Sequence, residues 1–197
     1  MDIVLASGSP RRKELLTQMG LTFRILVSDA DESVDPALAP AEQVEIISAR
    51  KARAVADLVG DKALIIAADT VVALDHQVMG KPHSRDQAIV MLTRLSGNTH
   101  TVYTGFTVLR GKEHFTASEA SDVTFRDLTV DEIAAYVDTG EPMDKAGAYG
   151  IQGKGALLVR GIRGDYFNVM GLPVCALGQA LAQFGLALPT LLQGGLA

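Results

Sequence analysis

A continuous apolar run from Ala63 to Ala68 is the feature that most narrows the folds open to this chain. Apolar residues in an unbroken row, without the alternation of a half-exposed strand, are typical of a strand covered on both faces. Such a strand lies in the middle of a sheet, with helices packed on either side. The chain of 197 residues is long enough to bury a core of that kind within one domain.

The segments around this run alternate between helical and extended patterns. Capping residues and helical spacing predict helices that follow Ser9, Ser84 and Thr129, and further helices are expected at about Pro40–Leu58 and at Pro173–Phe184. Extended segments are expected at Ile3–Ala6, at Ala156–Val159, and in a long hairpin formed by Thr99–Leu109 and Glu113–Phe125. We therefore predict an α/β fold in which a mixed sheet of parallel and antiparallel strands is flanked by helices.

No repeat, low-complexity tract or linker divides the chain. We expect a single domain over residues 1–187. The last segment, 188–197, contains Gly194-Gly195 and is expected to form a loose C-terminal tail.

Composition and missing motifs exclude several function classes. The chain has 18 basic and 23 acidic side chains and a net charge of −5, which does not suit a broad nucleic-acid-binding face. The one cysteine, Cys175, cannot form an internal disulfide and is expected in the core. There is no P-loop, nucleophile elbow or zinc-ligand spacing. The start lacks a basic signal-peptide region and no apolar stretch could cross a bilayer, so we expect a cytoplasmic protein without nucleic-acid or membrane partners.

The first candidate site is the segment Ser7–Lys13, where a strand gives way to a helix. A helix N-terminus carries unpaired N–H groups and the positive end of the helix dipole, so with Arg11 and Arg12 it would form a compact phosphate site. Because the dipole disfavours cations in the first turn, the two arginines indicate a recruited anion. The alternative is a capped surface helix with solvated arginines.

Two charged residues stand where apolar residues are expected. Lys51 lies four residues from Ile47 and four from Val55, on the apolar stripe of its helix. Its ammonium group therefore either reaches solvent or points into a cleft. Asp69 ends the apolar run, and strand ends are where open α/β sheets bind ligands. The alternatives for Asp69 are a functional carboxylate and a core carboxylate satisfied by a partner.

Three further segments carry weaker signals. Gly80-Lys81-Pro82 is most simply a turn. The acidic cluster 29–32 either offers oxygen ligands to a hard divalent cation or forms a solvated loop. The glycine-rich run 145–153 holds one amide, Gln152, which could recognise the edge of a nucleobase. The order of its glycines excludes a dinucleotide-binding fingerprint.

Taken together, several motifs in one order resemble the Maf family of nucleotide pyrophosphatases. The resemblance extends from about Ile3 to Phe184 and rests on residues 5–12, 67–71, 80–82, 141–153 and 168–173. It implies a Maf/ITPase-like fold and hydrolysis of a nucleoside triphosphate between its α- and β-phosphates, which yields a monophosphate and pyrophosphate. It also implies a divalent cation, Mg²⁺ or Mn²⁺, as cofactor. The oligomeric state stays open, a homodimer included.

The resemblance further implies a role for each matching residue. The triphosphate would be held by Ser7, Arg11, Arg12, Lys51 and Lys81, of which the two lysines count with Asp69 as the catalytic set. Glu32 and Asp69 would serve the metal, and Asp69 would also accept a proton. Asp29 and Asp31 compete with Glu32 for the same role.

The predicted substrate rests on three positions. Family members that act on dTTP and UTP are similar to this chain at Arg12, Thr70 and Gln152. Independently, the Gln152 amide could accept a hydrogen bond from N3–H and donate one to O4 of uracil or thymine, a pairing that cytosine mismatches. We therefore expect a dTTP/UTP pyrophosphatase that would extend to modified pyrimidine triphosphates. The alternatives are a pyrophosphatase for another modified nucleotide, such as 7-methyl-GTP, and a nucleotide-sensing regulator of cell division, since the family is associated with septum formation.

Overall fold

The structure, a computed structural model, describes residues 1–193 and contains two compact units. The first unit comprises Met1–Asp69, Thr104–Glu119 and the residues from Gly171 onward. The second comprises Thr70–Tyr103 and Ala120–Met170. The strands β3 (Leu64–Leu74), β5 (Thr99–Arg110) and β6 (Glu113–Phe125) each begin in one unit and end in the other. Neither unit is therefore a continuous stretch of sequence.

The strands form one mixed sheet, as predicted. Its order is β2 (Arg24–Ile25), β1 (Ile3–Leu5), β3, β5, β6 and β7 (Val159–Arg163), and β4 (Gln77–Met79) pairs with β3 outside this order. The pairs β1–β2 and β1–β3 are parallel, whereas β3–β4 and β6–β7 are antiparallel. The predicted hairpin of β5 and β6 turns at 111–112, where Gly111 has a φ of 58°.

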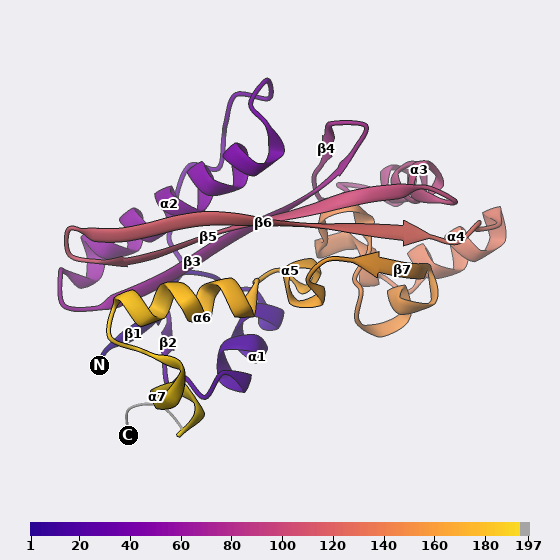
Figure 1. Cartoon of the computed structure of the whole chain (residues 1–197). Helices are drawn as coiled ribbons and strands as arrows, with labels where there is room; N and C mark the ends of the chain where they lie inside the picture. Colours follow the sequence, from indigo (N-terminus) through magenta and orange to yellow (C-terminus); the bar gives the residue numbers. More distant parts are fainter. Residues whose placement is uncertain (194–197) are drawn as a thin grey trace. The chain divides into compact units, whose positions relative to one another are not determined.

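The first unit surrounds the buried half of β3. Its helices are α1 (Pro10–Gln18), α2 (Pro40–Val59), α6 (Val174–Gln183) and α7 (Leu188–Leu192). Figure 1 shows α2 on one face of the strands, with α1 and α6 on the other. Residues 64–68 have no exposed surface, which confirms the central strand predicted from the apolar run. Ile65 and Ala67 pack in one cluster with Ala52 and Val55 of α2.

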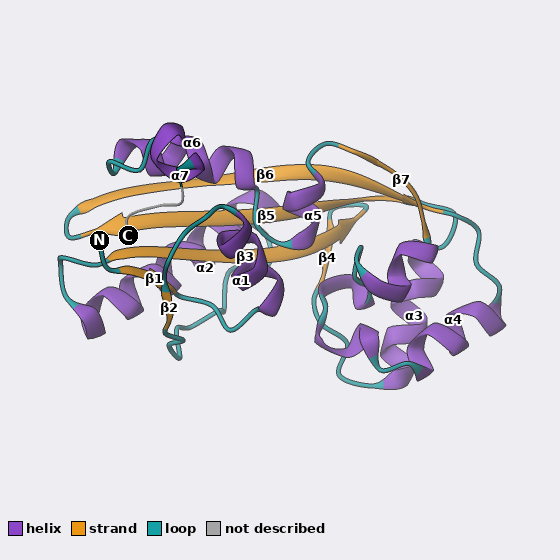
Figure 2. Cartoon of the chain, turned by 90° about the horizontal axis from the view of Figure 1, so that it is seen from below, coloured by secondary structure: helices purple, strands orange, loops and turns teal. Residues whose placement is uncertain are grey.

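The second unit has its own apolar core. Helices α3 (Arg85–Leu95) and α4 (Val130–Asp138) lie side by side, as Figure 2 shows. Phe125, Leu92 and Ile133 belong to the core cluster that these helices share with the strands. The unit also contains the 3₁₀ helices η1 (Glu141–Asp144), η2 (Ala146–Ala148) and η3 (Gly153–Leu157) and the short helix α5 (Tyr166–Met170).

Capping explains where two of these helices begin. The Ser84 hydroxyl accepts a hydrogen bond from the Gln87 amide at 3.1 Å at the start of α3. At the start of α4, Thr129 and Glu132 form a complete capping box, in which each side chain accepts from the other residue's amide. Both helices therefore start where the sequence predicts.

The structure differs from the sequence predictions at three places. Of the strand expected at Ala156–Val159, the first two residues belong to η3 and β7 begins only at Val159, because the glycines of this segment favour a tight turn. Cys175 is exposed on α6 and does not lie in the core. Residues 188–192 of the expected loose tail form α7, whose Leu191 is buried, and residues 194–197 lie outside the described part of the chain. Within residues 1–193, no helix is both long and apolar enough to span a membrane.

The contact between β5 and α2 provides a test of the packing in the first unit. A Cβ atom on Gly105 would overlap the Val44 carbonyl group and lie 2.7 Å from the Glu45 nitrogen. We expect Gly105→Ala to lower the free energy of unfolding by about 2 kcal/mol or more, since both groups are backbone and cannot move aside. Gly178→Ala in α6 is the control, because its Cβ would meet no atom within 4 Å.

Chemical denaturation of both variants measures the difference. The control should be unchanged or more stable by up to about 1 kcal/mol, the helix-propensity gain of alanine over glycine. Equal stabilities for the two variants would contradict the close approach of β5 to α2.

Candidate functional site

A cluster of charged side chains lies against β3 in the first unit. The side chains of a strand alternate between its two faces, so Asp69 points to the same face as Ile65 and Ala67, toward α2. Lys51 of α2 meets it there. The Lys51 Nζ atom lies 2.7 Å from Asp69 Oδ1 and 2.9 Å from Glu32 Oε1. One ammonium group therefore joins two carboxylates that are 37 residues apart in the sequence.

Two of the three side chains in this cluster are largely buried, which distinguishes it from a surface ion pair. The side chains of Lys51 and Asp69 are each 15% exposed, whereas that of Glu32 is 63% exposed. Of the two alternatives for Lys51, the structure therefore supports the one in which its ammonium points inward. Asp69 is satisfied by a partner, as the second alternative for that residue requires, and this pairing is compatible with a functional role.

The position of Asp69 within its strand corrects the sequence analysis. Asp69 does not end the strand: β3 continues for five further residues to Leu74. Continuation is possible because the residues after Thr70 are apolar and buried again, namely Val71, Val72, Ala73 and Leu74. The carboxylate therefore projects from the middle of a strand, between residues 64–66, which pair with β1, and residues 72–74, which pair with β4.

Arg12 forms a second, deeply buried part of the cluster. It is 9% exposed, and its guanidinium donates from Nε to the Gly171 carbonyl at 2.8 Å and from Nη1 to the Ser7 hydroxyl at 3.1 Å. Burial lowers the pKa of Arg12 and nearby Arg11 lowers it further, whereas Asp69 and Glu32 act to raise it. The charges of α1, β3 and the 29–32 loop therefore influence one another.

The start of α1 lies where the sequence predicts. Ser9 is the N-cap residue, Pro10 occupies the first turn, and no acidic residue lies in that turn. The Ser9 hydroxyl, however, makes no capping hydrogen bond. The Ser7 hydroxyl instead accepts from the Ser9 amide at 3.3 Å. A partly buried Arg11 completes the segment.

The carboxylates of the acidic loop contact different partners. Asp31 accepts a hydrogen bond from the Ser33 amide and lies 3.7 Å from Arg50. Glu32, in contrast, pairs with Lys51. Of the residues that competed for one metal-binding role, Glu32 is therefore the one next to Asp69. Within residues 1–193, no group of three or more His, Cys, Asp and Glu side chains converges as a metal site.

The remaining predicted residues, Thr70, Lys81 and Gln152, belong to the second unit. Thr70 is half-buried on β3, and Gln152 is half-buried just before η3. Lys81 is exposed in the turn after β4. There it borders an open surface pocket of about 310 Å³, whose other lining residues are Val78, Met79, Gly80, His83, Gln87, Val90, Met91 and Arg94.

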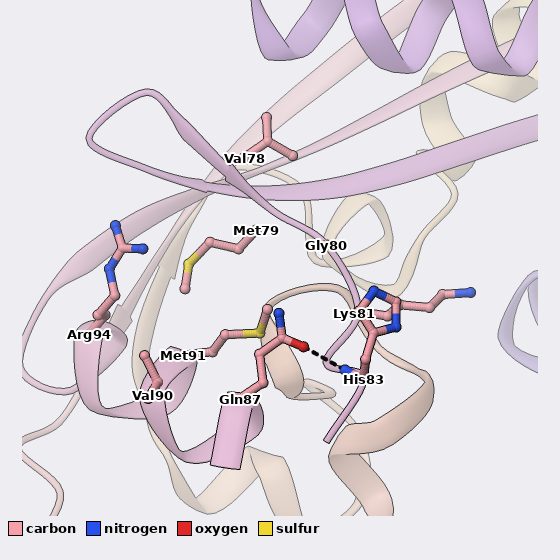
Figure 3. Close-up of a pocket in the computed structure, with 9 residues that line it drawn as sticks. All are labelled: Val78, Met79, Gly80, Lys81, His83, Gln87, Val90, Met91 and Arg94. Atoms are coloured by element: carbon pink, nitrogen blue, oxygen red, sulfur yellow. Dashed lines mark hydrogen bonds between the residues drawn. The ribbon is translucent and has the colours of Figure 1, made fainter. Parts of the chain in front are cut away.

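This pocket is not the predicted phosphate site. Figure 3 shows that the Lys81 side chain extends away from Met79 and Met91, which face the hollow. The Gln87 side chain is also occupied, because its Oε1 atom accepts from the His83 amide at 2.7 Å. Lys81 is the one predicted site residue in the lining.

Sequence reasoning missed two partners of the predicted residues. The Gly171 carbonyl that accepts from Arg12 is a backbone group, which no side-chain pattern indicates. Glu141 accepts hydrogen bonds from the amides of Lys154 and Gly155, two and three residues after Gln152. It lies within a motif that carries the resemblance, but its residue type alone suggested no role.

Comparisons with known proteins point in one direction. A family model described as Maf-like protein matches residues 2–184. A protein of Moorella thermoacetica named dTTP/UTP pyrophosphatase is 57% identical, in an alignment covering 93% of this chain and 95% of the relative. A protein of Symbiobacterium thermophilum with the same name is 50% identical and covers 93% of this chain and 94% of its own length.

A solved structure shows the same fold at low sequence identity. The Staphylococcus aureus Ham1 protein aligns with a TM-score of 0.52 and 16% identity, over 94% of this chain and all of that protein. This likeness supports the predicted ITPase-like fold class.

The Lys51–Asp69 pair generates a stability prediction. Lys51→Met should lower the free energy of unfolding by about 3 kcal/mol, because it leaves the largely buried Asp69 carboxylate without its cation. The double variant Lys51→Met/Asp69→Leu should recover part of this loss. Denaturation curves of the single and double variants give the coupling between the two side chains.

The exposed pair of Arg24 and Asp2 serves as the control. Its N–O distance of 2.8 Å is similar, but both side chains are about half exposed, so Arg24→Met should change stability much less. Additive effects of the Lys51 and Asp69 substitutions would contradict the interaction.

Proposed function

Because the chain belongs to the Maf-like protein family, we propose that it is a nucleoside triphosphate pyrophosphatase acting on dTTP and UTP. The observation that carries the proposal is the near-complete alignment with relatives of that name at 57% and 50% identity. The products would be the nucleoside monophosphate and pyrophosphate. Modified pyrimidine triphosphates are included in the proposed substrate class.

The triphosphate is the proposed ligand of the cationic residues. Ser7 and Arg11 lie at the start of α1, where helix amides and guanidinium groups favour anions. Arg12 would contribute a positive charge at a fixed position, since hydrogen bonds hold its guanidinium group to Gly171 and Ser7. Lys81 would contribute a second lysine charge. Positively charged groups that are already in place before the reaction stabilise the negative charge that develops in the transition state of phosphoryl transfer.

Asp69 is the proposed proton acceptor. Its carboxylate is restrained twice, by the backbone of β3 and by the Lys51 ammonium at 2.7 Å. A restrained carboxylate can orient a water molecule and take its proton as the oxygen attacks phosphorus. Lys51 then has two proposed roles: it positions Asp69, and it contributes charge near the phosphates.

The donor set at Lys51 also fits a divalent cation. Glu32 Oε1 and Asp69 Oδ1 both lie within 3 Å of one cationic atom, so their oxygens already converge where positive charge is favourable. Carboxylate oxygens are the ligands that Mg²⁺ and Mn²⁺ prefer. We propose that Glu32 and Asp69 hold such a cation. When bound, it would lower the pKa of water and neutralise phosphate charge.

Base recognition is proposed for the segment around Gln152. Its amide would accept from N3–H and donate to O4 of uracil or thymine. Arg12 and Thr70 complete the set of positions expected to distinguish the dTTP/UTP group from other family members.

Pyrophosphate release from a panel of standard and modified nucleoside triphosphates tests the activity. We expect hydrolysis of dTTP and UTP with Mg²⁺ or Mn²⁺, loss in chelator, and recovery when the metal is restored. Asp69→Asn should lower turnover by about 10²- to 10⁴-fold, the range for loss of a general base. An unchanged rate in a folded Asp69→Asn protein would remove Asp69 from the mechanism. A preference for a purine triphosphate would contradict the proposed substrate class.

Gln152→Glu tests base recognition. A carboxylate keeps the acceptor for N3–H but loses the donor to O4, so kcat/KM for dTTP and UTP should fall by roughly 10- to 100-fold. CTP carries an amino group at that position and should lose less or gain. Steady-state kinetics with all three nucleotides decide the matter, and an equal change for each would mean that Gln152 does not contact the base.

A further inference from the structure

The segment that carries Gln152 is held by hydrogen bonds to two side chains of the same unit. The Glu141 carboxylate accepts from the Lys154 amide through Oε2 and from the Gly155 amide through Oε1, each at 3.0 Å. The Tyr136 hydroxyl donates to Glu141 Oε1 at 3.0 Å and accepts from the Gly150 amide at 3.3 Å. Backbone groups on both sides of Gln152 are therefore fixed to one Tyr136–Glu141 pair.

The glycines of this segment allow the contact. A Cβ atom on Gly153 would lie 2.9 Å from Glu141 Oε2, and Gly153 has a φ of 68°. A Cβ atom on Gly155 would overlap the Gly150 carbonyl and lie 2.8 Å from the Tyr136 hydroxyl. The glycines thus permit close approach to the protein's own polar groups.

The residue before Gly150 is fixed as well. Tyr149 is 6% exposed, and its hydroxyl lies 2.8 Å from Nε2 of the buried His100. Burial lowers the pKa of His100 to about 4, so this ring is neutral near pH 7 and does not add charge to the segment.

The charge of Glu141 is part of the arrangement. Partial burial opposes ionisation, but the amides of Gly155 and Lys154, the Tyr136 hydroxyl and the nearby Lys145 together lower the pKa of Glu141. The carboxylate form has two oxygens free to accept, one for each backbone donor. An amide side chain of the same size would keep one acceptor and turn an NH₂ group toward an N–H donor.

We propose that Glu141, through Tyr136 and the backbone from Gly150 to Gly155, is a positioning residue that holds Gln152 in the geometry needed to select uracil and thymine over cytosine. It does not touch the substrate. The inference rests on the proposed function, in which Gln152 recognises the base. A fixed amide discriminates between uracil and cytosine because it cannot move to suit either, whereas a mobile amide would lose that preference.

The experiment compares Glu141→Gln and Tyr136→Phe with a matched control, Glu132→Gln. Glu132 lies in the same unit, accepts a backbone amide and pairs with Arg126, but has no hydrogen bond to residues 150–155. We expect Glu141→Gln to raise KM for dTTP and UTP about tenfold with little change in kcat, since uniform binding is lost. The ratio of kcat/KM for dTTP over CTP should fall by a similar factor. Tyr136→Phe should show a smaller change in the same direction.

Hydrogen exchange supplies a second readout. The amides of Gly150, Lys154 and Gly155 should exchange faster in Glu141→Gln than in the wild type, and Glu132→Gln should leave them unchanged. A destabilised but otherwise normal enzyme would lose activity equally for all nucleotides. Such an equal loss, or an unchanged dTTP to CTP ratio in both Glu141→Gln and Tyr136→Phe, would overturn the proposal.

Failure of the proposed function would look different. A wild-type protein that does not hydrolyse dTTP or UTP rejects the pyrophosphatase activity. In that case, binding of dTMP and dCMP to the same variants decides the role of Glu141. Loss of a preference for dTMP in Glu141→Gln but not in Glu132→Gln supports it, and equal affinity of the wild-type protein for both monophosphates overturns it.

Discussion

The complete burial of β3 is the constraint on which the site depends. A strand with no exposed surface over residues 64–68 must have helices on both faces, and the alternation of its side chains then assigns each residue to one of them. Asp69 falls on the face of α2 and Lys51 on the inward stripe of that helix, so the pair forms without any special loop. A charged group on a buried face needs such a partner, because an unpaired carboxylate there would be costly.

The sequence predicts features set by local patterns. The central strand, the helix starts at Ser84 and Thr129 and the hairpin turn follow from periodicity and capping, and all occur. Periodicity places Lys51 on the apolar stripe of its helix but leaves the direction of its ammonium open, and the ion pair with Asp69 decides it. The errors arise where distant residues decide. Asp69 looks like a strand end because it is charged, yet pairing with strands on either side carries β3 past it. The segment at 156–159 looks extended because it is apolar, yet its first two residues belong to η3, whose amides at Lys154 and Gly155 donate to Glu141.

The candidate site divides in the same way. Residue type and spacing indicate Arg12, Lys51 and Asp69, because each places charge where an apolar residue or an anion is expected. The Gly171 carbonyl and the Glu141 carboxylate give no such signal. The first is a backbone atom, and the second lies among other charged residues near a turn. Groups that orient functional residues are defined by their contacts and not by their residue type. They can therefore be identified only once the three-dimensional structure is known.

Because β3, β5 and β6 each pass through both units, the order in which the chain is synthesised affects when the site can form. Arg12 emerges from the ribosome early, but its acceptor at Gly171 follows 159 residues later. The strand pairing of the first unit likewise waits for residues 104–119. A nascent chain therefore holds a cation meant for burial until nearly all of the protein has been made, and one edge of β3 stays unpaired until β5 follows. Such long-range pairing slows folding. The site therefore forms late, and the partly folded chain needs protection from aggregation until then.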